Sequence, residues 1–157
     1  VVAGSTGLVG KAVVKKLASL GLNHIGITRA DADLLDYDST QKLINALRPT
    51  CIIDAAAVVG GIKYNSEFPV KFLIENLEIQ NNLMRASHEA NVEKFIFLGS
   101  SCIYPRNCQQ PIKEEYILSG QLEPTNSAYA IAKIAGIELV KSYRKQFGRS
   151  HCYRQQN

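Results

Sequence analysis

The sequence predicts an α/β fold in which helices cover both faces of a doubly wound parallel sheet. Short apolar runs alternate along the chain with stretches of helical periodicity, and a glycine-rich turn joins the first run to the first helical stretch. With 157 residues, 46% of them hydrophobic, the chain can bury one sizeable core and is too short for two ordinary domains. Ligands of such folds bind beyond the carboxyl ends of the strands, so we look for function in the loops there.

The first predicted strand and helix flank the glycine-rich turn. Residues 1–3 are apolar and run directly into the turn, and the chain does not begin with Met, so we expect a strand whose beginning is missing. Residues 8–20 place apolar side chains at helical spacing, and Gly21 is expected to cap the end of this helix. Residues 24–28 are the second predicted strand.

The middle of the chain repeats this alternation. An amphipathic helix is expected to open at Ser39 and to end before Pro49, which cannot continue a helix. The apolar residues 51–53 follow as the third predicted strand. A long helix is predicted over residues 69–90, because its apolar side chains fall on one face, and the buried strand 95–98 comes next.

The last third of the chain is irregular before it becomes helical. Residues 99–127 contain three prolines and are expected to form loops, after which a helix is predicted over residues 128–147. Residues 1–140 carry 13 Lys and Arg against 14 Asp and Glu, whereas residues 141–157 carry five basic side chains and no acidic one. These basic residues form no stripe interleaved with aromatic side chains, so nucleic acid is not predicted as a partner.

Several classes of protein are excluded by composition. The four cysteines form no Cys-x-x-Cys pair and have no histidine at metal-ligand spacing, so neither a metal site nor a redox motif is predicted. No apolar run approaches the ~20 residues that a membrane-spanning helix needs. We therefore expect a soluble cytoplasmic protein without a membrane partner.

The glycine-rich turn has the spacing G-x-x-G-x-x-G between a strand and a helix. Glycines permit a tight turn and let the backbone approach a pyrophosphate, which the free N–H groups at a helix start can bind. A surface turn would also explain three glycines, but the strand-turn-helix setting favours a nucleotide. Gly10 is expected to let the helix pack closely on the sheet. The segment predicted to bind the dinucleotide is Gly4, Ser5, Thr6, Gly7, Leu8, Val9 and Gly10.

The end of the second predicted strand indicates which dinucleotide binds. An acidic residue there would accept the ribose 2′-hydroxyl of NAD, whereas the guanidinium of Arg29 can hold the 2′-phosphate of NADP. We predict NADP(H), with a solvated loop charge as the competing interpretation of Arg29. Further residues expected beside the cofactor are Asp33, Leu34, Ala55, Ala56 and Ala57. Core packing would also explain the alanines.

Four residues form the predicted catalytic site. Tyr129 and Lys133 lie four residues apart, so a helix brings a phenol beside an ammonium, which is expected to lower the pKa of the tyrosine toward neutrality. The tyrosine can then exchange a proton with a carbonyl, and Lys133 can also reach a ribose hydroxyl. Such a pair often arises by chance, but Ser100 and Cys102 follow strand 95–98. Ser100 is expected to bind the substrate oxygen, and Cys102 to act as acid or base beside a carbonyl.

Three segments carry a resemblance to a known family: Ala-Ala-Val-Val-Gly-Gly-Ile (56–62), Phe-Leu-Gly-Ser-Ser-Cys-Ile-Tyr-Pro (97–105) and Leu-Glu-Pro-Thr-Asn-Ser-Ala-Tyr-Ala-Ile-Ala-Lys-Ile-Ala-Gly-Ile (122–137). With the glycine turn, they resemble the extended short-chain dehydrogenase/reductases, and within these the GDP-L-fucose synthase family. The resemblance implies that residues 1–148 are an NADP-binding Rossmann domain, incomplete at both ends. It also implies that residues 149–157 are a tail that does not match the family, and that the C-terminal substrate lobe is lacking.

The resemblance further implies that the parent protein epimerises and reduces GDP-4-keto-6-deoxy-D-mannose to GDP-L-fucose with NADPH. Hydride would go to C4, with Tyr129 as proton donor, Lys133 as its electrostatic support and Ser100 holding the carbonyl, while Cys102 would serve epimerisation at C3 and C5. The family's histidine partner of the cysteine is missing, since His151 does not match it. We therefore expect little or no turnover by this chain alone, and a homodimer for the full-length protein.

Two other interpretations stay open. The parent protein could be another sugar-nucleotide epimerase, dehydratase or reductase of the same superfamily, which would share the glycine turn and the Tyr129 and Lys133 pair but not Cys102. It could also be a non-catalytic dinucleotide-binding module, which would need neither Tyr129 nor Lys133.

Overall fold

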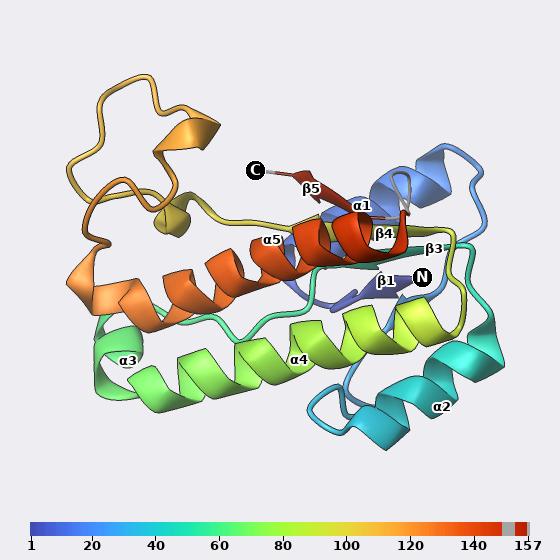
Figure 1. Ribbon diagram of the computed structural model, residues 1–157. Coiled ribbons are helices and arrows are strands. Elements are labelled where there is room, and N and C mark those ends of the chain that lie inside the picture. Colours follow the sequence, from blue (N-terminus) through green and yellow to red (C-terminus); the bar gives the residue numbers. More distant parts are fainter. Residues whose placement is uncertain (149–152, 157) are drawn as a thin grey trace.

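A five-stranded parallel sheet organises the chain (Figure 1). The computed structural model describes residues 1–148 and the strand at 153–156. The strand order is β2-β1-β3-β4-β5, and every pair is parallel. The strands are β1 (Val2–Ala3), β2 (Gly26–Ile27), β3 (Cys51–Asp54), β4 (Lys94–Leu98) and β5 (Tyr153–Gln156). Because the chain steps from β1 to β2 and then crosses back to β3, the direction of winding reverses between β1 and β3.

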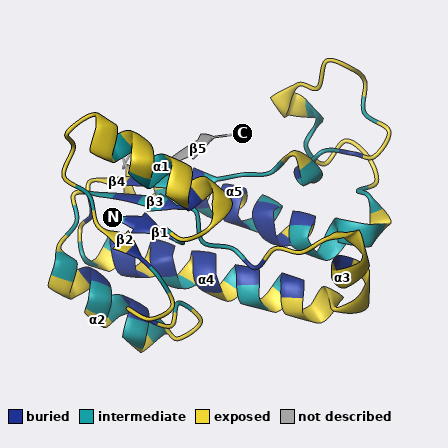
Figure 2. Cartoon of the chain, turned by 180° about the vertical axis from the view of Figure 1, so that it is seen from behind, coloured by how far each residue is buried: buried dark blue, intermediate teal, exposed yellow. Residues whose placement is uncertain are grey.

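Helices cover both faces of this sheet. The helices are α1 (Leu8–Ser19), α2 (Tyr37–Leu47), α3 (Ile62–Glu67), α4 (Pro69–Glu89) and α5 (Ser127–Phe147). Figure 1 shows α2, α4 and α5 in front of the sheet, and Figure 2, which views the chain from behind, shows α1 on the opposite face. The predicted doubly wound α/β fold is therefore confirmed. Within the described residues, no helix is long and apolar enough to cross a membrane.

The irregular segment between β4 and α5 contains three short 3₁₀ turns. They are η1 (Ser101–Ile103), η2 (Glu114–Tyr116) and η3 (Pro124–Asn126). Figure 1 shows that this segment extends from the end of β4 away from the sheet before it returns to the start of α5. The prediction of loops here is confirmed, and the helix that follows ends at Gly148, whose φ of 63° closes it in the left-handed conformation.

Some element boundaries differ from the sequence prediction. Helix α2 begins two residues before Ser39, because the carboxylate of Asp36 supplies the N-terminal cap and accepts a 2.7 Å hydrogen bond from the backbone N–H of Ser39. Strand β2 is only two residues long, where 24–28 was expected. Helix α3 was not expected, since six residues are too few to display helical periodicity.

A strand after residue 148 is also not expected from the sequence, because the tail is polar. The backbone of β5 nevertheless pairs in parallel with residues 95–98 of β4. Backbone hydrogen bonds hold a strand at the open edge of a sheet, and they do not require apolar side chains. Residues 149–152 and 157 lie outside the described residues, and with them His151 and much of the segment expected not to match the family.

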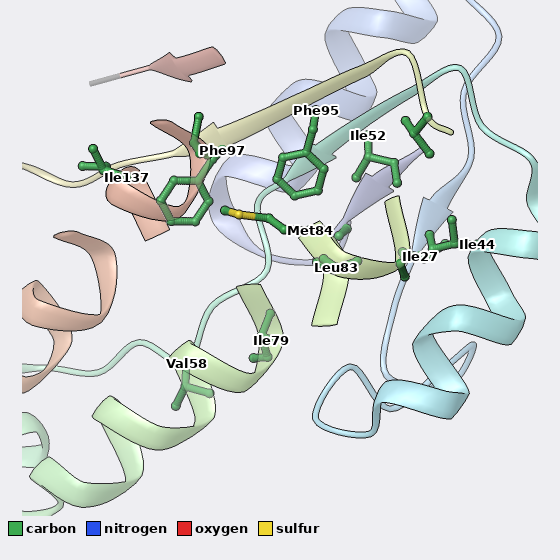
Figure 3. Packing of buried hydrophobic residues seen from close by; sticks show 14 of the residues in the cluster. Ile27, Ile44, Ile52, Val58, Ile79, Leu83, Met84, Phe95, Phe97 and Ile137 are labelled. Carbon is green, nitrogen blue, oxygen red and sulfur yellow. The ribbon is translucent and has the colours of Figure 1, made fainter. Parts of the chain in front are cut away.

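The core lies between the sheet and helix α4. Figure 3 shows Phe95 and Phe97 of β4 and Ile52 of β3 pointing toward Leu83 and Met84 of α4, and all five side chains are at most 1% exposed. Burial of a side chain of this size contributes about 1.5–3 kcal/mol. This contact fixes the carboxyl ends of β3 and β4 relative to the helices that carry the candidate site.

A buried amide fastens the loop after β3 to this core. Asn76 of α4 is 3% exposed; its Oδ1 accepts a 2.9 Å hydrogen bond from the backbone N–H of Val58, and its Nδ2 donates to the carbonyl of Val58 at 3.0 Å. The same Nδ2 donates to the carbonyl of Phe72 at 2.7 Å. Both backbone polar groups of Val58 therefore depend on one side chain.

We predict that Asn76→Leu lowers the free energy of unfolding by about 2–4 kcal/mol, because it leaves buried backbone groups of Val58 without partners while keeping the number of side-chain heavy atoms and the branch at Cγ. Urea unfolding followed by circular dichroism measures this. Asn81→Leu, on the exposed face of the same helix, is the matched control and should change stability by less than about 0.5 kcal/mol. Equal effects of the two substitutions would contradict the assignment.

Candidate active site

A cavity opens where the winding of the sheet reverses. It has a volume of about 610 Å³ and lies beyond the carboxyl ends of β1, β2 and β3. Nine of the residues expected to contact a dinucleotide line it: Gly4, Thr6, Gly7, Arg29, Asp33, Leu34, Ala55, Ala56 and Ala57. The reversal point of a doubly wound sheet is where such folds bind nucleotides, so the location suits the predicted ligand.

The glycine turn is built by close backbone contacts. Gly4 has a φ of +71°, and a Cβ at this residue would lie 2.7 Å from both the carbonyl oxygen of Ala55 and the Cα of Ala56. A Cβ at Gly10 would lie 2.1 Å from the carbonyl oxygen of Gly4. Neither position tolerates a side chain, so the start of α1 packs directly on the turn. This cradle of bare backbone fits a pyrophosphate.

Four other residues of the predicted segment do not line the cavity. The hydroxyl of Ser5 donates to the carbonyl oxygen of Ile27 at 3.2 Å and so ties the turn to β2. Leu8 and Val9 lie in the first turn of α1 and are 92% and 50% exposed. Their backbone N–H groups lie at the start of the helix, where an anion can bind, whereas Gly10 contributes close packing.

Arg29 lies in a loop that is held by local hydrogen bonds. One carboxylate oxygen of Asp31 accepts from both the backbone N–H and the hydroxyl of Thr28, each at 2.8 Å. Both bonds lower the pKa of Asp31, and the bond from the hydroxyl has the larger effect. On the α4 side, the Nδ2 of Asn82 donates to the carbonyl oxygens of Leu34 and Leu35 at 2.9 and 3.0 Å. The loop is thereby held in place, and Arg29 lines the cavity.

The structure brings the four predicted catalytic residues together beyond the carboxyl end of β4. Ser100 follows this strand, and its Oγ accepts from the backbone N–H of Cys102 at 3.3 Å, which caps η1. Tyr129 shares a side-chain hydrogen bond with Ser100. The Nζ of Lys133 lies 6.0 Å from the centroid of the Tyr129 ring. Serine, phenol, thiol and ammonium thus occupy one edge of the sheet.

Close packing of α5 on β4 places Lys133. Gly136 has no side chain, and a Cβ there would lie 2.4 Å from the Cζ of Phe97, so the helix approaches the strand directly. One turn earlier, the Nζ of Lys133 donates to the carbonyl oxygen of Leu98 at 3.2 Å and lies 4.6 Å from the centroid of the Phe97 ring. Lys133 is only 5% exposed, and burial lowers its pKa while the charge of Asp54 opposes that shift.

The pKa of Tyr129 differs from the sequence prediction. Burial raises it above its ordinary value, the hydrogen bond with Ser100 lowers it, and the charges of Cys102 and Asp54 raise it further. The expected lowering by Lys133 is therefore not found, because the phenolate loses more solvation than Ser100 replaces. Tyr129 holds its proton at neutral pH in this state.

Two polar residues of this region were missed by the sequence interpretation. Asp54, the last residue of β3, is 0% exposed, and burial raises its pKa to about 6, although Lys133 opposes the shift. The Nδ2 of Asn126 donates to the Sγ of Cys102 at 3.3 Å. An acidic residue at the end of an apolar strand is a visible signal for Asp54; Asn126 precedes the helix of Tyr129, but nothing in its local pattern indicates a contact with sulfur.

The described residues hold no group of three or more His, Cys, Asp or Glu side chains that could bind a metal ion. The cysteines among them, Cys51, Cys102 and Cys108, are free thiols.

We predict that Asp54→Asn stabilises the protein at pH 7.5 by up to about 3 kcal/mol, because ionising the buried carboxylate opposes folding once its pKa rises from 3.8 to about 6. With the folded pKa above the unfolded one, wild type loses stability relative to the variant as the pH rises from about 4 to about 6. The gain should shrink to about 1 kcal/mol at pH 4.5. Urea unfolding at both values measures this, and a gain that does not depend on pH would contradict it.

Comparison with known proteins identifies relatives of the chain. Residues 1–154 match the model of the NAD dependent epimerase/dehydratase family. The GDP-L-fucose synthase of Sinorhizobium fredii is 48% identical over 147 residues, which cover 94% of this chain and 47% of that protein. The chain spans about half the length of the curated relatives it matches.

Solved structures of related enzymes share the fold. The GDP-mannoheptose C4 reductase of Campylobacter jejuni, solved with NADP bound, has a TM-score of 0.92 at 34% identity, covering 98% of this chain and 45% of that one. The GDP-L-fucose synthetase of Naegleria fowleri bound to NADP has a TM-score of 0.86 at 31% identity, covering 98% and 47%. With a family match over nearly its whole length, the chain belongs to the NAD dependent epimerase/dehydratase family.

Proposed function

We propose that this chain is the cofactor-binding part of an enzyme that epimerises and reduces GDP-4-keto-6-deoxy-D-mannose to GDP-L-fucose with NADPH. The gathering of Ser100, Cys102, Tyr129 and Lys133 at one strand end, beside a dinucleotide-sized cavity, is the observation that carries this proposal. The similarity to a GDP-L-fucose synthase supports the choice of substrate. A general reductase of keto sugars would need no thiol at this position.

The cavity supports NADP(H) as the cofactor. Bare backbone at Gly4 and Gly7 can receive the pyrophosphate, and the alanines after β3 leave room for a flat ring system. Arg29 is the basic residue on the cavity wall and can pair with a 2′-phosphate. Two related structures were solved with NADP bound. When bound, NADPH supplies the hydride that reduces the C4 carbonyl.

Residues after the end of β4 and on α5 supply the proton that reduction requires. Tyr129 donates its phenolic proton to the carbonyl oxygen as negative charge develops there, and its raised pKa keeps it protonated at neutral pH until that moment. Ser100, already hydrogen-bonded to Tyr129, holds the same oxygen. Lys133 orients a ribose hydroxyl and, as a cation, stabilises the phenolate left after proton transfer.

Cys102 serves the epimerisation. Carbons C3 and C5 flank the C4 carbonyl, so their protons are acidic, and a thiolate can remove one while an acid delivers a different proton to the other face of the ring. The amide of Asn126 donates to the Sγ of Cys102 and fixes its orientation beside Ser100. An acid that completes this exchange is not identified among the described residues of this chain.

A second candidate function is the reduction of a different GDP-sugar. The similarity to a GDP-mannoheptose C4 reductase favours it, and its chemistry would use Ser100, Tyr129 and Lys133 without the thiol. Cys102→Ser distinguishes the two in the full-length protein. Loss of solvent deuterium incorporation at C3 and C5, with reduction of a pre-epimerised sugar retained, supports the first proposal, whereas unchanged epimerisation overturns the role of Cys102.

We predict that the chain binds NADPH at least about tenfold more tightly than NADH, and that Arg29→Met removes the difference by weakening NADPH binding about 10- to 100-fold. Titration with each cofactor, followed by nicotinamide fluorescence, measures both. Arg144→Met, near the exposed C-terminal end of α5, is the control and should leave both affinities unchanged. Equal affinities of the wild-type chain for the two cofactors would overturn the choice of NADP.

We also predict that Tyr129→Phe leaves NADPH affinity within about twofold of wild type, because the phenol acts on the substrate oxygen. Addition of GDP-4-keto-6-deoxy-D-mannose to the wild-type chain with NADPH should give little or no loss of absorbance at the nicotinamide band. Oxidation at a rate abolished by Tyr129→Phe would show that this chain suffices for turnover, contrary to our proposal.

A further inference from the structure

A buried carboxylate lies beneath the candidate catalytic residues. Asp54 ends β3 and is fully buried between Ala3 of β1 and Phe97 of β4, its neighbours in the parallel ladder. Its Oδ1 accepts a 3.1 Å hydrogen bond from the backbone N–H of Ala56, whereas its Oδ2 is buried and has no hydrogen-bond partner among the described residues. A carboxylate held in this way requires a compensating charge.

The compensating charge comes from α5. Residues opposite each other in a parallel ladder point to the same face of the sheet, so Asp54 and Phe97 both face α5. The Nζ of Lys133 lies over the Phe97 ring and is itself almost fully buried. The two opposite charges therefore share one buried layer, and each favours the charged form of the other.

The surroundings of this pair are nearly free of other charges. On α5, Tyr129 is the other titratable group whose pKa the charge of Asp54 affects. Cys102 of η1 is a titratable group whose charge also affects Tyr129. The strand neighbours Ala3 and Phe97 are uncharged. The buried side chains of α4 are uncharged as well: Phe72, Asn76, Ile79, Gln80, Leu83, Met84, Ala86 and Ser87.

We propose that Asp54 is a positioning residue of the active site, whose buried carboxylate acts as the counter-ion of the Lys133 ammonium and so sets the charge that reaches Tyr129. The catalytic meaning of this role rests on the function proposed above. With Asp54 ionised, its negative charge favours the ammonium form of Lys133 and disfavours the phenolate form of Tyr129. With Asp54 protonated, both effects are lost.

This arrangement predicts that the effect of Asp54 on Lys133 and Tyr129 changes with pH in mild acid. Burial raises the pKa of Asp54 to about 6, so the carboxylate changes charge over a range in which ordinary aspartates stay ionised. As the pH falls through that range, the effect of Asp54 on both Lys133 and Tyr129 disappears. A residue that only filled space at the end of β3 would produce no such dependence.

The test is an NMR titration of Lys133 in the whole chain, with lysine labelled with ¹³C at Cε. The Lys133 signal is assigned from its loss in Lys133→Arg. Asp54→Asn keeps the shape and the bond from Ala56 and removes the charge, so we expect the titration midpoint of Lys133 to fall by about one pH unit. Glu78→Gln, which removes a charge from the exposed face of α4, should leave it unchanged. Equal midpoints in wild type and Asp54→Asn would overturn the proposal.

A second measurement uses the wild-type chain and does not depend on the folding of Asp54→Asn. In wild type labelled at the Cγ of aspartate, one of the five aspartate signals should titrate near pH 6, and the Lys133 Cε signal should shift over the same range. If all five titrate near 4, the proposal is overturned. Fluorescence titration with NADPH on the same samples separates the two proposals, because failure to bind NADPH overturns the function while leaving the Asp54 and Lys133 coupling to be decided by these midpoints.

Discussion

The contact between Gly10 of α1 and the carbonyl of Gly4 is the constraint on which the site depends. A Cβ at Gly10 would lie 2.1 Å from that oxygen, so only glycine allows the helix to start directly on the turn after β1. From this contact follow the exposed backbone of the turn and the short path from β1 to α1. The contact of Gly4 with Ala55 and Ala56 then joins the turn to the end of β3. The cavity exists because these two strand ends carry almost no side-chain bulk.

The second half of the site depends on burial. Helix α5 lies close to β4 because Gly136 makes room for Phe97, and this brings Lys133 and Tyr129 under the ends of the strands. Removal from water raises the pKa of the phenol and of the Asp54 carboxyl and lowers the pKa of the ammonium. All three shifts favour the uncharged form of the group. The same close packing that positions the groups therefore also poises them for proton transfer.

Periodicity and turn chemistry predicted the doubly wound sheet and four of the five helices, because each long helix buries one apolar face and each strand ends in a recognisable turn. The short α3 and the polar β5 were not predictable in this way, since their formation depends on neighbours rather than on their own side chains. The pairing of Tyr129 and Lys133 was predicted from their spacing, and Ser100 was placed with them because it follows the predicted strand 95–98. The pKa of Tyr129 and the burial of Asp54 depend on how the elements pack, which cannot be derived from a single sequence.

We expect the backbone cradle around Gly4 to receive a dinucleotide. The most direct test is an amide ¹H–¹⁵N correlation spectrum of the chain, recorded with increasing NADP⁺. We predict that the amides of residues 4–10 and 55–57 and of Arg29 shift together, with one dissociation constant, while those of residues 45–47, the last three of α2, stay in place. Shifts confined to other parts of the chain, or none at residues 4–10 at saturating cofactor, would contradict it.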